Sequence, residues 1–415
     1  MTMQEVRPVA AAERLTELDV IRGFALFGVL LINLYGHNEF ALPEARLEAL
    51  PTAPIDGALG FLFDWLVAGK AQALFSMLFG FGFAIFLERA DARGADGVRL
   101  YLRRLTVLLV IGLVHVLFVF FGDILHAYAL MGFVLALTRR LPSRLLLGAG
   151  AALCLFAFVP MTLHLAWQAA ATGEAPPLAQ AMEAGMARRY DVFLGADPVA
   201  YVRELFRAMG DEWLLSVFAW SYFAMVLGRF LLGAWLFRQG WMQRAGDHLA
   251  GFRRWAPRLL LLGLALAFAD ALTGWLDPEL APAGEAAVDA LQGAAQLTLA
   301  LGYGATLVVL LQGERWRRAL SGLGDVGRMA LTNYLVQSLI YLFVFYGFGL
   351  GLMRQGGALV CLLIAVPAFA LQIVFSRWWL ARYRFGPAEW LWRSATYGRW
   401  QPFRREAVVT AAPVA

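Results

Sequence analysis

Apolar stretches long enough to span a membrane recur along the whole chain. Most hold the ~20 residues that an α-helix needs to cross a bilayer core about 30 Å thick. Because lipid offers the backbone no hydrogen-bond partners, each stretch is predicted to be a helix. Ten stretches can be marked, with approximate edges: 20–36, 70–88, 105–121, 124–138, 145–167, 213–237, 258–276, 291–312, 329–350 and 357–380.

The composition excludes a soluble fold. Hydrophobic residues make up 60% of the 415 residues and charged residues 16%, against about 45–50% and about 25% in an ordinary globular protein. The net charge of +5 would suit a nucleic-acid partner, but a nucleic-acid binder would not be this apolar. Cys154 and Cys361 stand in apolar stretches without metal-ligand spacing, so no metal site or disulfide framework is predicted. We predict an all-α, polytopic transmembrane helix bundle.

The basic residues predict how the chain is oriented in the membrane. If the N-terminus is cytoplasmic, most of the 35 Lys and Arg residues fall in cytoplasmic segments, as the positive-inside rule requires. This pattern fits about ten spans with both termini cytoplasmic. We predict one transmembrane domain over 1–415, with a cytoplasmic N-terminal segment (1–19), an external amphipathic loop (168–212) and a cytoplasmic tail (381–415).

Two polar residues of the first span share one helix face. Arg22 and Asn33 are eleven residues apart, which places them ~16 Å apart along the axis after almost three turns. Arg22 could extend to the lipid headgroups while Asn33 joins two helices. Alternatively, the two residues begin a polar track that leads inward from the cytoplasmic surface.

A histidine and an aspartate mark the third span and the turn after it. His115 lies eleven residues beyond Arg104, ~16 Å into the membrane. An imidazole at this depth can accept and return a proton, as general-base chemistry requires. Asp123 is predicted in a tight external hairpin, where its carboxylate could orient the imidazole. The structural alternative is a hydrogen-bonded core histidine and a hairpin-capping aspartate; His126 and His37 are predicted to be structural.

Further polar side chains lie in later spans. Arg229 and Asp270 are predicted at similar depths, and a buried ion pair between them is favoured over an anion site. Asn333, Gln337 and Tyr341 recur every four residues and form one stripe, for which hydrogen bonding between helices is the favoured interpretation.

Two kinds of motif have a structural interpretation in a membrane. The glycines of Gly80-Phe81-Gly82 and Gly347-Phe348-Gly349-Leu350-Gly351 follow no strand, so they predict close helix packing and not a phosphate loop. Residues 386–393 combine tryptophans with arginine, which is typical of an interfacial anchor. A site for an anionic cytoplasmic cofactor, with Arg393, is the alternative for this segment.

Five segments spread over residues 14–400 carry a family resemblance. They are Leu18-Asp19-Val20-Ile21-Arg22-Gly23-Phe24-Ala25 with Asn33, Leu78-Phe79-Gly80-Phe81-Gly82, His115 with Gly122-Asp123-Ile124-Leu125 and Tyr128, Gly327-Arg328-Met329-Ala330-Leu331-Thr332-Asn333-Tyr334, and Gly386-Pro387-Ala388-Glu389-Trp390-Leu391-Trp392-Arg393. In these segments and their order, the chain resembles the YeiB family of bacterial inner-membrane proteins, which contain a domain of unknown function. The resemblance implies a multi-pass protein of the bacterial inner (cytoplasmic) membrane and names no substrate.

The opening from Arg22 to Asn33 is also similar to the first helix of transmembrane acyltransferases, including heparan-α-glucosaminide N-acetyltransferase. The resemblance implies passage of an acyl group from cytoplasmic acyl-CoA through the membrane to an external acceptor. Relatives in the acyltransferase-3 branch have a histidine where this chain has Asn33. Because an amide cannot act as a base, another group must do so here, and we assign this role to His115.

We therefore predict an acyltransferase that uses acyl-CoA as co-substrate and a small molecule or glycan as acceptor. His115, with Asp123, would deprotonate the acceptor or carry the acyl group, and Asn33 would hydrogen-bond the carbonyl. Asn333 is predicted to help Asn33 at the carbonyl. The predicted donor-binding residues are Arg22, Arg328, Asn333 and Arg393.

A transporter of small molecules or lipids is the alternative function. The same polar track would bind and move a small anion without covalent chemistry, with His115 and Asp123 relaying protons. A third hypothesis is a structural partner of another envelope protein. Membrane lipid is an expected partner, nucleic acid is not expected, and the chain could form a homodimer.

Overall fold

The computed structural model describes seven stretches of the chain: residues 15–39, 48–92, 96–174, 176–214, 216–276, 280–353 and 355–405. The outer parts of the two predicted terminal segments, 1–14 and 406–415, lie outside these stretches. Within them the fold is all-α, as predicted, and the only strand-like pairing is an isolated β-bridge between Tyr383 and Arg404.

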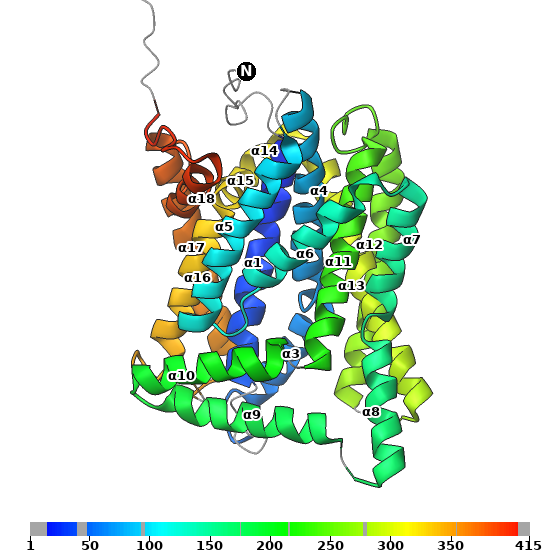
Figure 1. Ribbon diagram of the computed structural model, residues 1–415, viewed down its shortest axis with the longest axis vertical. Helices are drawn as coiled ribbons and strands as arrows, with labels where there is room; N and C mark the ends of the chain where they lie inside the picture. Colours follow the sequence, from blue (N-terminus) through cyan, green and yellow to red (C-terminus); the bar gives the residue numbers. More distant parts are fainter. Residues whose placement is uncertain are drawn as a thin grey trace, which may run out of the picture.

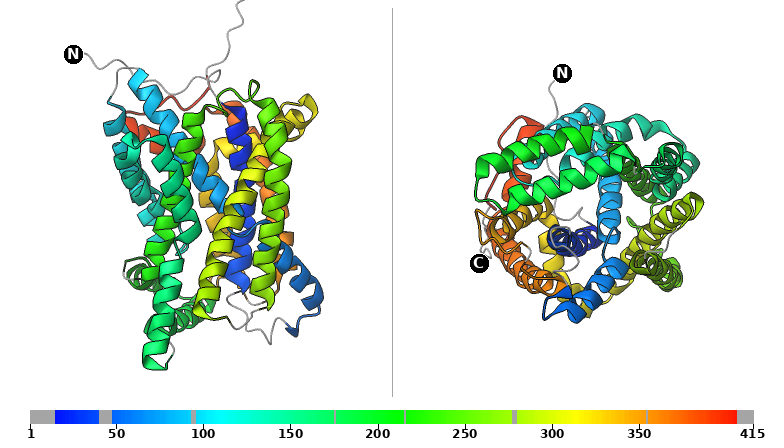
Figure 2. Two further views of the ribbon diagram at one scale, coloured as in Figure 1. Left: turned by 90° about the vertical axis from the view of Figure 1, so that its right-hand side faces the viewer. Right: turned by 90° about the horizontal axis from the view of Figure 1, so that it is seen from below.

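The long helices run roughly parallel, and α1 (Thr16–Glu39) stands in the middle of them (Figures 1 and 2). This central position follows from its sequence, since Leu26, Leu30 and Leu34 lie on one apolar face and are almost fully buried. The helices around it are α4 (Lys70–Ala92), α5 (Gly97–Phe118), α6 (Leu125–Leu137), α7 (Ser143–Phe156), α8 (Val159–Thr172), α11 (Val217–Gln239), α12 (Leu249–Leu276), α13 (Pro282–Leu311), α16 (Ala330–Phe345) and α17 (Ala358–Arg382).

The described residues contain eight helical segments long and apolar enough to cross a membrane, or nine if the bent pair α15–α16 is one span. Ten spans were predicted, and the difference lies at 124–138, where α6 has only 13 residues. The prediction also missed α3 (Ala53–Leu66), which joins α4 in one broken span. The break falls at Gly69, whose positive φ of 73° suits a residue without a side chain.

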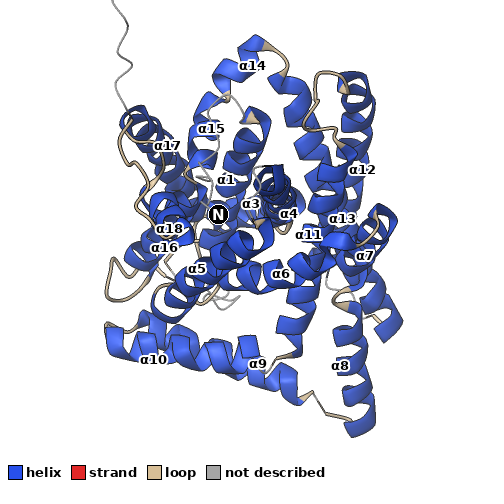
Figure 3. Cartoon of the chain, turned by 45° about the horizontal axis from the view of Figure 1, so that its top comes forward, coloured by secondary structure: helices blue, strands red, loops and turns tan. Residues whose placement is uncertain are grey.

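The two ends of the bundle differ. At one end α1 begins, α17 ends, and the short helices α14 (Glu314–Ala319), α15 (Ser321–Arg328) and α18 (Pro387–Tyr397) gather (Figures 1 and 3). We call this the arginine-rich end, after Arg22, Arg89, Arg104, Arg328 and Arg393. Its cytoplasmic location stays a prediction of the positive-inside rule.

A cap of helices lies across the opposite end. It consists of α9 (Pro177–Leu194), α10 (Pro198–Ala208) and a π-helical turn (Met209–Leu214), and it runs crosswise to the bundle (Figure 1). These elements account for most of the predicted loop 168–212, whose first residues belong to α8. α10 is amphipathic and buries Tyr201, Leu205 and Ala208 against the bundle.

Glycines allow α4 and α11 to pack in direct backbone contact. Close packing was predicted for both glycines of the Gly-Phe-Gly motif, and the structure shows it for one of them. A Cβ at Gly80 would overlap the carbonyl oxygen of Phe230, and a Cβ at Gly233 that of Met77. A Cβ at Gly82, in contrast, would meet nothing within 4 Å. Gly80 is therefore a packing glycine, and Gly82 is not.

We expect Gly80→Ala to destabilise the protein by about 1–3 kcal/mol, because the added methyl group forces two helix backbones apart. Gly82→Ala, two residues away on the same helix, is the matched control and should leave stability unchanged within about 0.5 kcal/mol. Thermal unfolding of both purified variants in one detergent measures the difference. Equal melting temperatures for the two variants would contradict this packing.

Candidate functional site

A tight hairpin between α5 and α6 forms the centre of the site. The chain turns within a few residues, with the Phe120 amide donating to the His115 carbonyl (2.8 Å) and the Asp123 amide to the Phe120 carbonyl (3.2 Å). α6 approaches α5 closely because Gly112 has no side chain; a Cβ there would overlap the backbone of His126. The hairpin thereby brings two histidines and Asp123 together.

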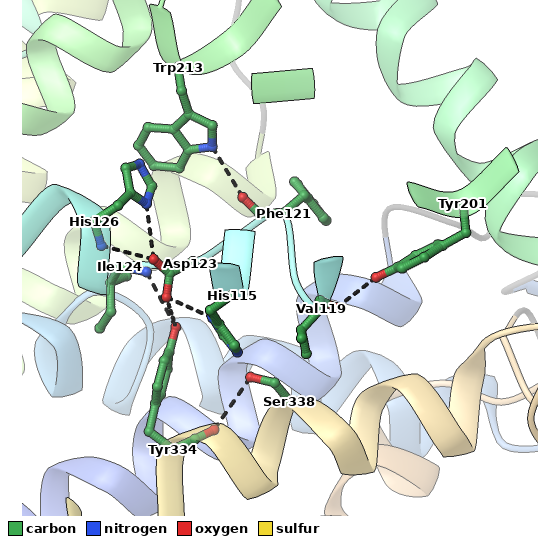
Figure 4. A network of polar contacts seen from close by, with 10 residues as sticks. All are labelled: His115, Val119, Phe121, Asp123, Ile124, His126, Tyr201, Trp213, Tyr334 and Ser338. Carbon is green, nitrogen blue, oxygen red and sulfur yellow. Dashed lines mark hydrogen bonds and ion pairs between the residues drawn. The ribbon is translucent and has the colours of Figure 1, made fainter. Parts of the chain in front are cut away.

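Asp123 accepts hydrogen bonds from both histidines (Figure 4). The Nδ1 atom of His115 lies 2.8 Å from Oδ1 of Asp123, and the Nδ1 atom of His126 lies 3.0 Å from Oδ2. The His126 backbone amide also donates to Oδ2 (2.9 Å). The Tyr334 hydroxyl, from α16, is 3.4 Å from Oδ1 and accepts the Ile124 amide at 3.3 Å.

The cap covers this hairpin, so Asp123 is buried within the protein, while its place on the external side of the membrane stays a prediction. Tyr201 of α10 donates to the Val119 carbonyl (2.6 Å), and the Trp213 indole donates to the Phe121 carbonyl (3.1 Å). Asp123 is 0% exposed and His115 3% exposed. The sequence shows the turn but not the helices that fold over it.

The histidines keep reactive nitrogens. The Nε2 atoms of His115 and His126 are buried and have no hydrogen-bond partner among the described residues. Both Nδ1 atoms face the same carboxylate at hydrogen-bond distance, which is the geometry of an oriented base. The described residues hold no cluster of three or more His, Cys, Asp or Glu side chains able to bind a metal ion.

A cavity of about 310 Å³ runs inward from the arginine-rich end. Its lining includes five arginines: Arg22, Arg89, Arg104, Arg328 and Arg393. The rest of the wall is mostly apolar and aromatic, with side chains such as Phe75, Phe79, Phe83, Phe86 and Leu108. Its lining also includes Ile124, Leu125, Tyr128 and Tyr334 from the hairpin region and the neighbouring helix. We call these four residues the floor.

The tryptophan-rich segment 386–393 builds one wall of this cavity. Glu389 caps α16, because its carboxylate accepts the Leu331 amide (2.7 Å), the Thr332 amide (3.1 Å) and the Thr332 hydroxyl (2.6 Å). Trp392 donates its indole N–H to the Arg104 carbonyl (2.9 Å), and the Arg104 guanidinium lies 3.9 Å from the centre of the Trp392 ring. The segment is therefore more than an interfacial anchor.

Burial perturbs the charged groups of this wall. It raises the pKa of the Glu389 carboxyl above its ordinary value, against the lowering effect of the hydrogen bonds from Thr332 and Leu331. Burial also lowers the pKa of the Arg393 guanidinium, although Tyr397 and Glu389 favour its charged form. Clustered cations in a partly buried wall are stabilised by an anionic ligand.

The other two predicted donor-binding arginines lie at the mouth of the cavity. Arg22 pairs with Asp19 (2.9 Å), and Arg328 pairs with Asp325 (3.3 Å) on the short helix α15. Both guanidinium groups are partly exposed, at 27% and 23%. The fold thus brings Arg22, Arg328 and Arg393 from three distant segments to one cavity.

Asn33 and Asn333 do not line this cavity. The Asn333 amide donates to the Ser376 hydroxyl of α17 (3.0 Å). Asn33 interacts with the Tyr341 hydroxyl. The ring of Phe120 packs against both Tyr341 and His115, with ring centres 5.6 Å and 6.0 Å away respectively. His115 is therefore buried in packed protein, and Phe120 touches both His115 and the Tyr341 that Asn33 contacts.

Hydrogen bonds between helices account for the predicted stripe on α16. Asn333 bonds Ser376, and the Gln337 amide donates to Gln372 at 3.0 Å, both on α17. With Tyr341 against Asn33 of α1, each member of the stripe joins α16 to a neighbour. This favours the structural interpretation over a ligand site.

The predicted ion pair between Arg229 and Asp270 is wrong. Arg229 donates to the side-chain carbonyls of Gln72 (3.2 Å) and Gln296 (2.5 Å). Asp270 instead pairs with Lys70, at 3.9 Å. Spacing along the sequence gives the depth of each residue in the membrane. It does not give the rotation of α11 and α12 about their axes, which decides the residues that Arg229 and Asp270 face.

Comparisons with known proteins show the family of the chain. The chain is 33% identical to the uncharacterized protein YxaH of Bacillus subtilis (strain 168), over 98% of this chain and 100% of that one. It is 32% identical to the uncharacterized protein YeiB of Escherichia coli (strain K12), over 92% of this chain and 96% of that one. The chain belongs to the YeiB family.

The family model named "Protein of unknown function (DUF418)" matches residues 236–399. In this YeiB-family chain those residues include α15, α16 and α18, and thus Arg328, Tyr334, Glu389 and Arg393 of the cavity. No solved structure matches the chain.

Sequence reasoning did not single out four residues of the candidate site. Tyr334 and Tyr128 were noted only as parts of motifs, and Arg104 only as a marker of depth, although all three line the cavity. His126 was assigned a structural role because it seemed near the outer surface. Its spacing of three residues from Asp123, at the start of a helix, is the signal that could have indicated the shared carboxylate.

Proposed function

We propose that this chain is a transmembrane acyltransferase of the bacterial inner membrane. It takes an acyl group from acyl-CoA at the arginine-rich end, on the cytoplasmic side, and passes it to a small-molecule or glycan acceptor from the cap side. One observation carries the proposal: a single cavity runs from five arginines to Tyr334, whose hydroxyl bonds the Asp123 that holds His115.

The cavity suits a donor with a polyanionic head and a narrow arm. Arg22, Arg328 and Arg393 would hold the phosphates with charge-assisted hydrogen bonds. The aromatic walls would surround the uncharged arm and place the thioester at the floor.

Catalysis would then take place where the floor meets the hairpin. The Tyr334 and His115 rings are 5.4 Å apart, so the imidazole packs directly against a side chain of the floor. The phenols of Tyr128 and Tyr334 line the floor, and each would have to turn from its present partner, Ser76 (2.6 Å) or Asp123 (3.4 Å), to donate a hydrogen bond to the carbonyl oxygen as charge develops there, the role predicted for Asn33 and Asn333. His115, oriented by Asp123, performs the proton transfer as a general acid–base.

A transporter is the second candidate, and one observation favours it. The broken span α3–α4 is interrupted beside a buried pair, Lys70 and Asp270, and discontinuous helices with charged residues at membrane depth are typical of transporters.

The test uses purified protein in proteoliposomes with radiolabelled acetyl-CoA and a pool of envelope glycans. Transfer of label to a glycan, with release of CoA, supports the acyltransferase. Accumulation of a small solute inside the vesicles without release of CoA supports the transporter and overturns our proposal. Empty vesicles treated in the same way provide the background.

A further inference from the structure

Asp123 is bound by two imidazoles that lie on opposite sides of it (Figure 4). An ionised carboxylate only accepts hydrogen bonds, so the Nδ1 atoms at Oδ1 and Oδ2 must both carry protons. In each neutral ring, the lone pair is then on Nε2. Both Nε2 atoms are buried and unpartnered among the described residues. The cluster thus presents two separate basic nitrogens.

The charge of the cluster limits its protonation. Among the described residues, only His115 and His126 lie within ion-pairing distance of the fully buried Asp123. The nearby charges on other elements are engaged elsewhere: Arg189 of α9 pairs with Glu212 of the cap, and Arg229 of α11 binds two glutamines. A buried carboxylate needs one compensating positive charge, and a second would leave an uncompensated cation. One positive charge on either ring would balance the carboxylate, which would let one imidazole act as an acid and the other as a base.

The two histidines face different parts of the protein. His115 packs against Tyr334, a floor residue of the cavity, with ring centres 5.4 Å apart. His126 packs at right angles to Trp213 of the cap, with ring centres 4.5 Å apart. Figure 4 shows His126 beside Trp213, with His115 directed toward Tyr334 and Ser338. One acid–base group thus serves the donor side and the other the cap side.

We infer that His126 is a second catalytic residue, the base that accepts the proton of the acceptor's hydroxyl or amine under the cap. This inference rests on the proposed function and deepens it by dividing the proton transfers between two histidines. The acceptor of this step is a neutral nucleophile. An anionic nucleophile would be repelled by the Asp123 carboxylate and would not need a base.

The acceptor oxygen or nitrogen forms a bond to the acyl carbon, and its proton passes to Nε2 of His126. The carbon–sulfur bond of the thioester breaks, and the leaving thiolate takes the Nε2 proton of the His115 imidazolium. The positive charge moves from one side of Asp123 to the other, so the buried cluster keeps the same total charge. His126 then releases a proton to water, and His115 regains one.

Asparagine substitutions test this division of roles. An asparagine side chain can place an N–H near the position of Nδ1, and so retain the bond to Asp123, while Nε2 is deleted. With a hydroxyl acceptor, we expect His126→Asn to lower kcat by about 10²–10⁴-fold, the usual contribution of a general base. With hydroxylamine, a nucleophile that needs no base, His126→Asn should regain most of the wild-type rate. His115→Asn should fail with both acceptors.

A matched control is His248→Asn, since His248 also has an unpartnered Nε2 but lies against Trp241 at the arginine-rich end. It should transfer at the wild-type rate. A wild-type rate in His126→Asn, or the same loss with both acceptors, would overturn the inference. Absence of transfer by the wild-type protein would instead remove the proposed function itself, and the inference with it.

A measurement on the wild-type protein covers the case in which the variant does not fold. The rate of transfer is followed in mixtures of H₂O and D₂O. Two protons moving in one step predict a curved dependence on the deuterium fraction. A linear dependence of the rate on the deuterium fraction would indicate that one proton moves in the rate-limiting step, and would overturn the two-histidine step.

Discussion

His115→Asn should reduce acyl transfer by about 10²–10⁴-fold while the protein remains folded. The reason is local. Asparagine can still donate a hydrogen bond to Asp123, which His115 meets through Nδ1 at 2.8 Å, but it has no atom in place of the basic Nε2. Transfer of radiolabel from acetyl-CoA to the acceptor, at saturating concentrations of both, measures the change.

The fold must be checked separately, because Asp123 is buried and depends on its partners. The melting temperature of His115→Asn should stay close to that of the wild-type protein, and its affinity for CoA should be unchanged, because His115 does not line the cavity. Undiminished transfer by a well-folded His115→Asn protein would remove this residue from the mechanism. A lost affinity for CoA would show instead that the hairpin shapes the donor site.

Much of the fold could be predicted because lipid imposes length and polarity on each helix. α11 and α17 coincide closely with apolar stretches of the sequence. The errors fall where a helix is not a full span. α6 has 13 residues and α3 has 14, so neither satisfies a rule that is based on the thickness of the bilayer. Their positions are set by packing against neighbours.

The candidate site was predictable where its residues are close in sequence. His115 and Asp123 are on either side of one hairpin, so their pairing followed from the tight turn. Contacts between distant helices were not predictable in this way. Spacing along a helix gives the depth of a side chain, but the rotation of that helix decides its partner. Arg229 therefore meets Gln72 instead of Asp270, and Asn333 meets Ser376 instead of the cavity.

The position of the cavity arginines could be predicted without knowing the rotation of each helix, because their proposed role depends only on their being at one end of the bundle. Arg22 comes from α1 and Arg393 from α18, yet both line the same cavity. Basic residues near the ends of spans collect on one side of the membrane whatever the rotation of each helix. The sequence therefore indicated which end would carry the positive charge, although not the shape of the cavity.

The double variant Arg22→Gln/Arg393→Gln should weaken binding of CoA by about 10²–10⁴-fold. Hydrogen bonds to charged groups contribute about 1.5–3 kcal/mol each, and every 1.4 kcal/mol changes the dissociation constant about tenfold. Calorimetric titration of CoA at two salt concentrations measures the loss. The wild-type affinity should fall with added salt, and the variant should show a smaller dependence because fewer charges meet the phosphates.

Arg318→Gln is the matched control, since Arg318 belongs to the same end of the bundle but is 76% exposed and pairs only with Glu314 among the described residues. It should bind CoA as the wild-type protein does. An unchanged dissociation constant in the double variant would mean that the cavity does not hold the phosphates of the donor. An equal loss in Arg318→Gln would mean that the overall positive charge of this end, and not the cavity, attracts the anion. Only a loss confined to the cavity arginines connects the mouth, through Tyr334, to the chemistry at His115.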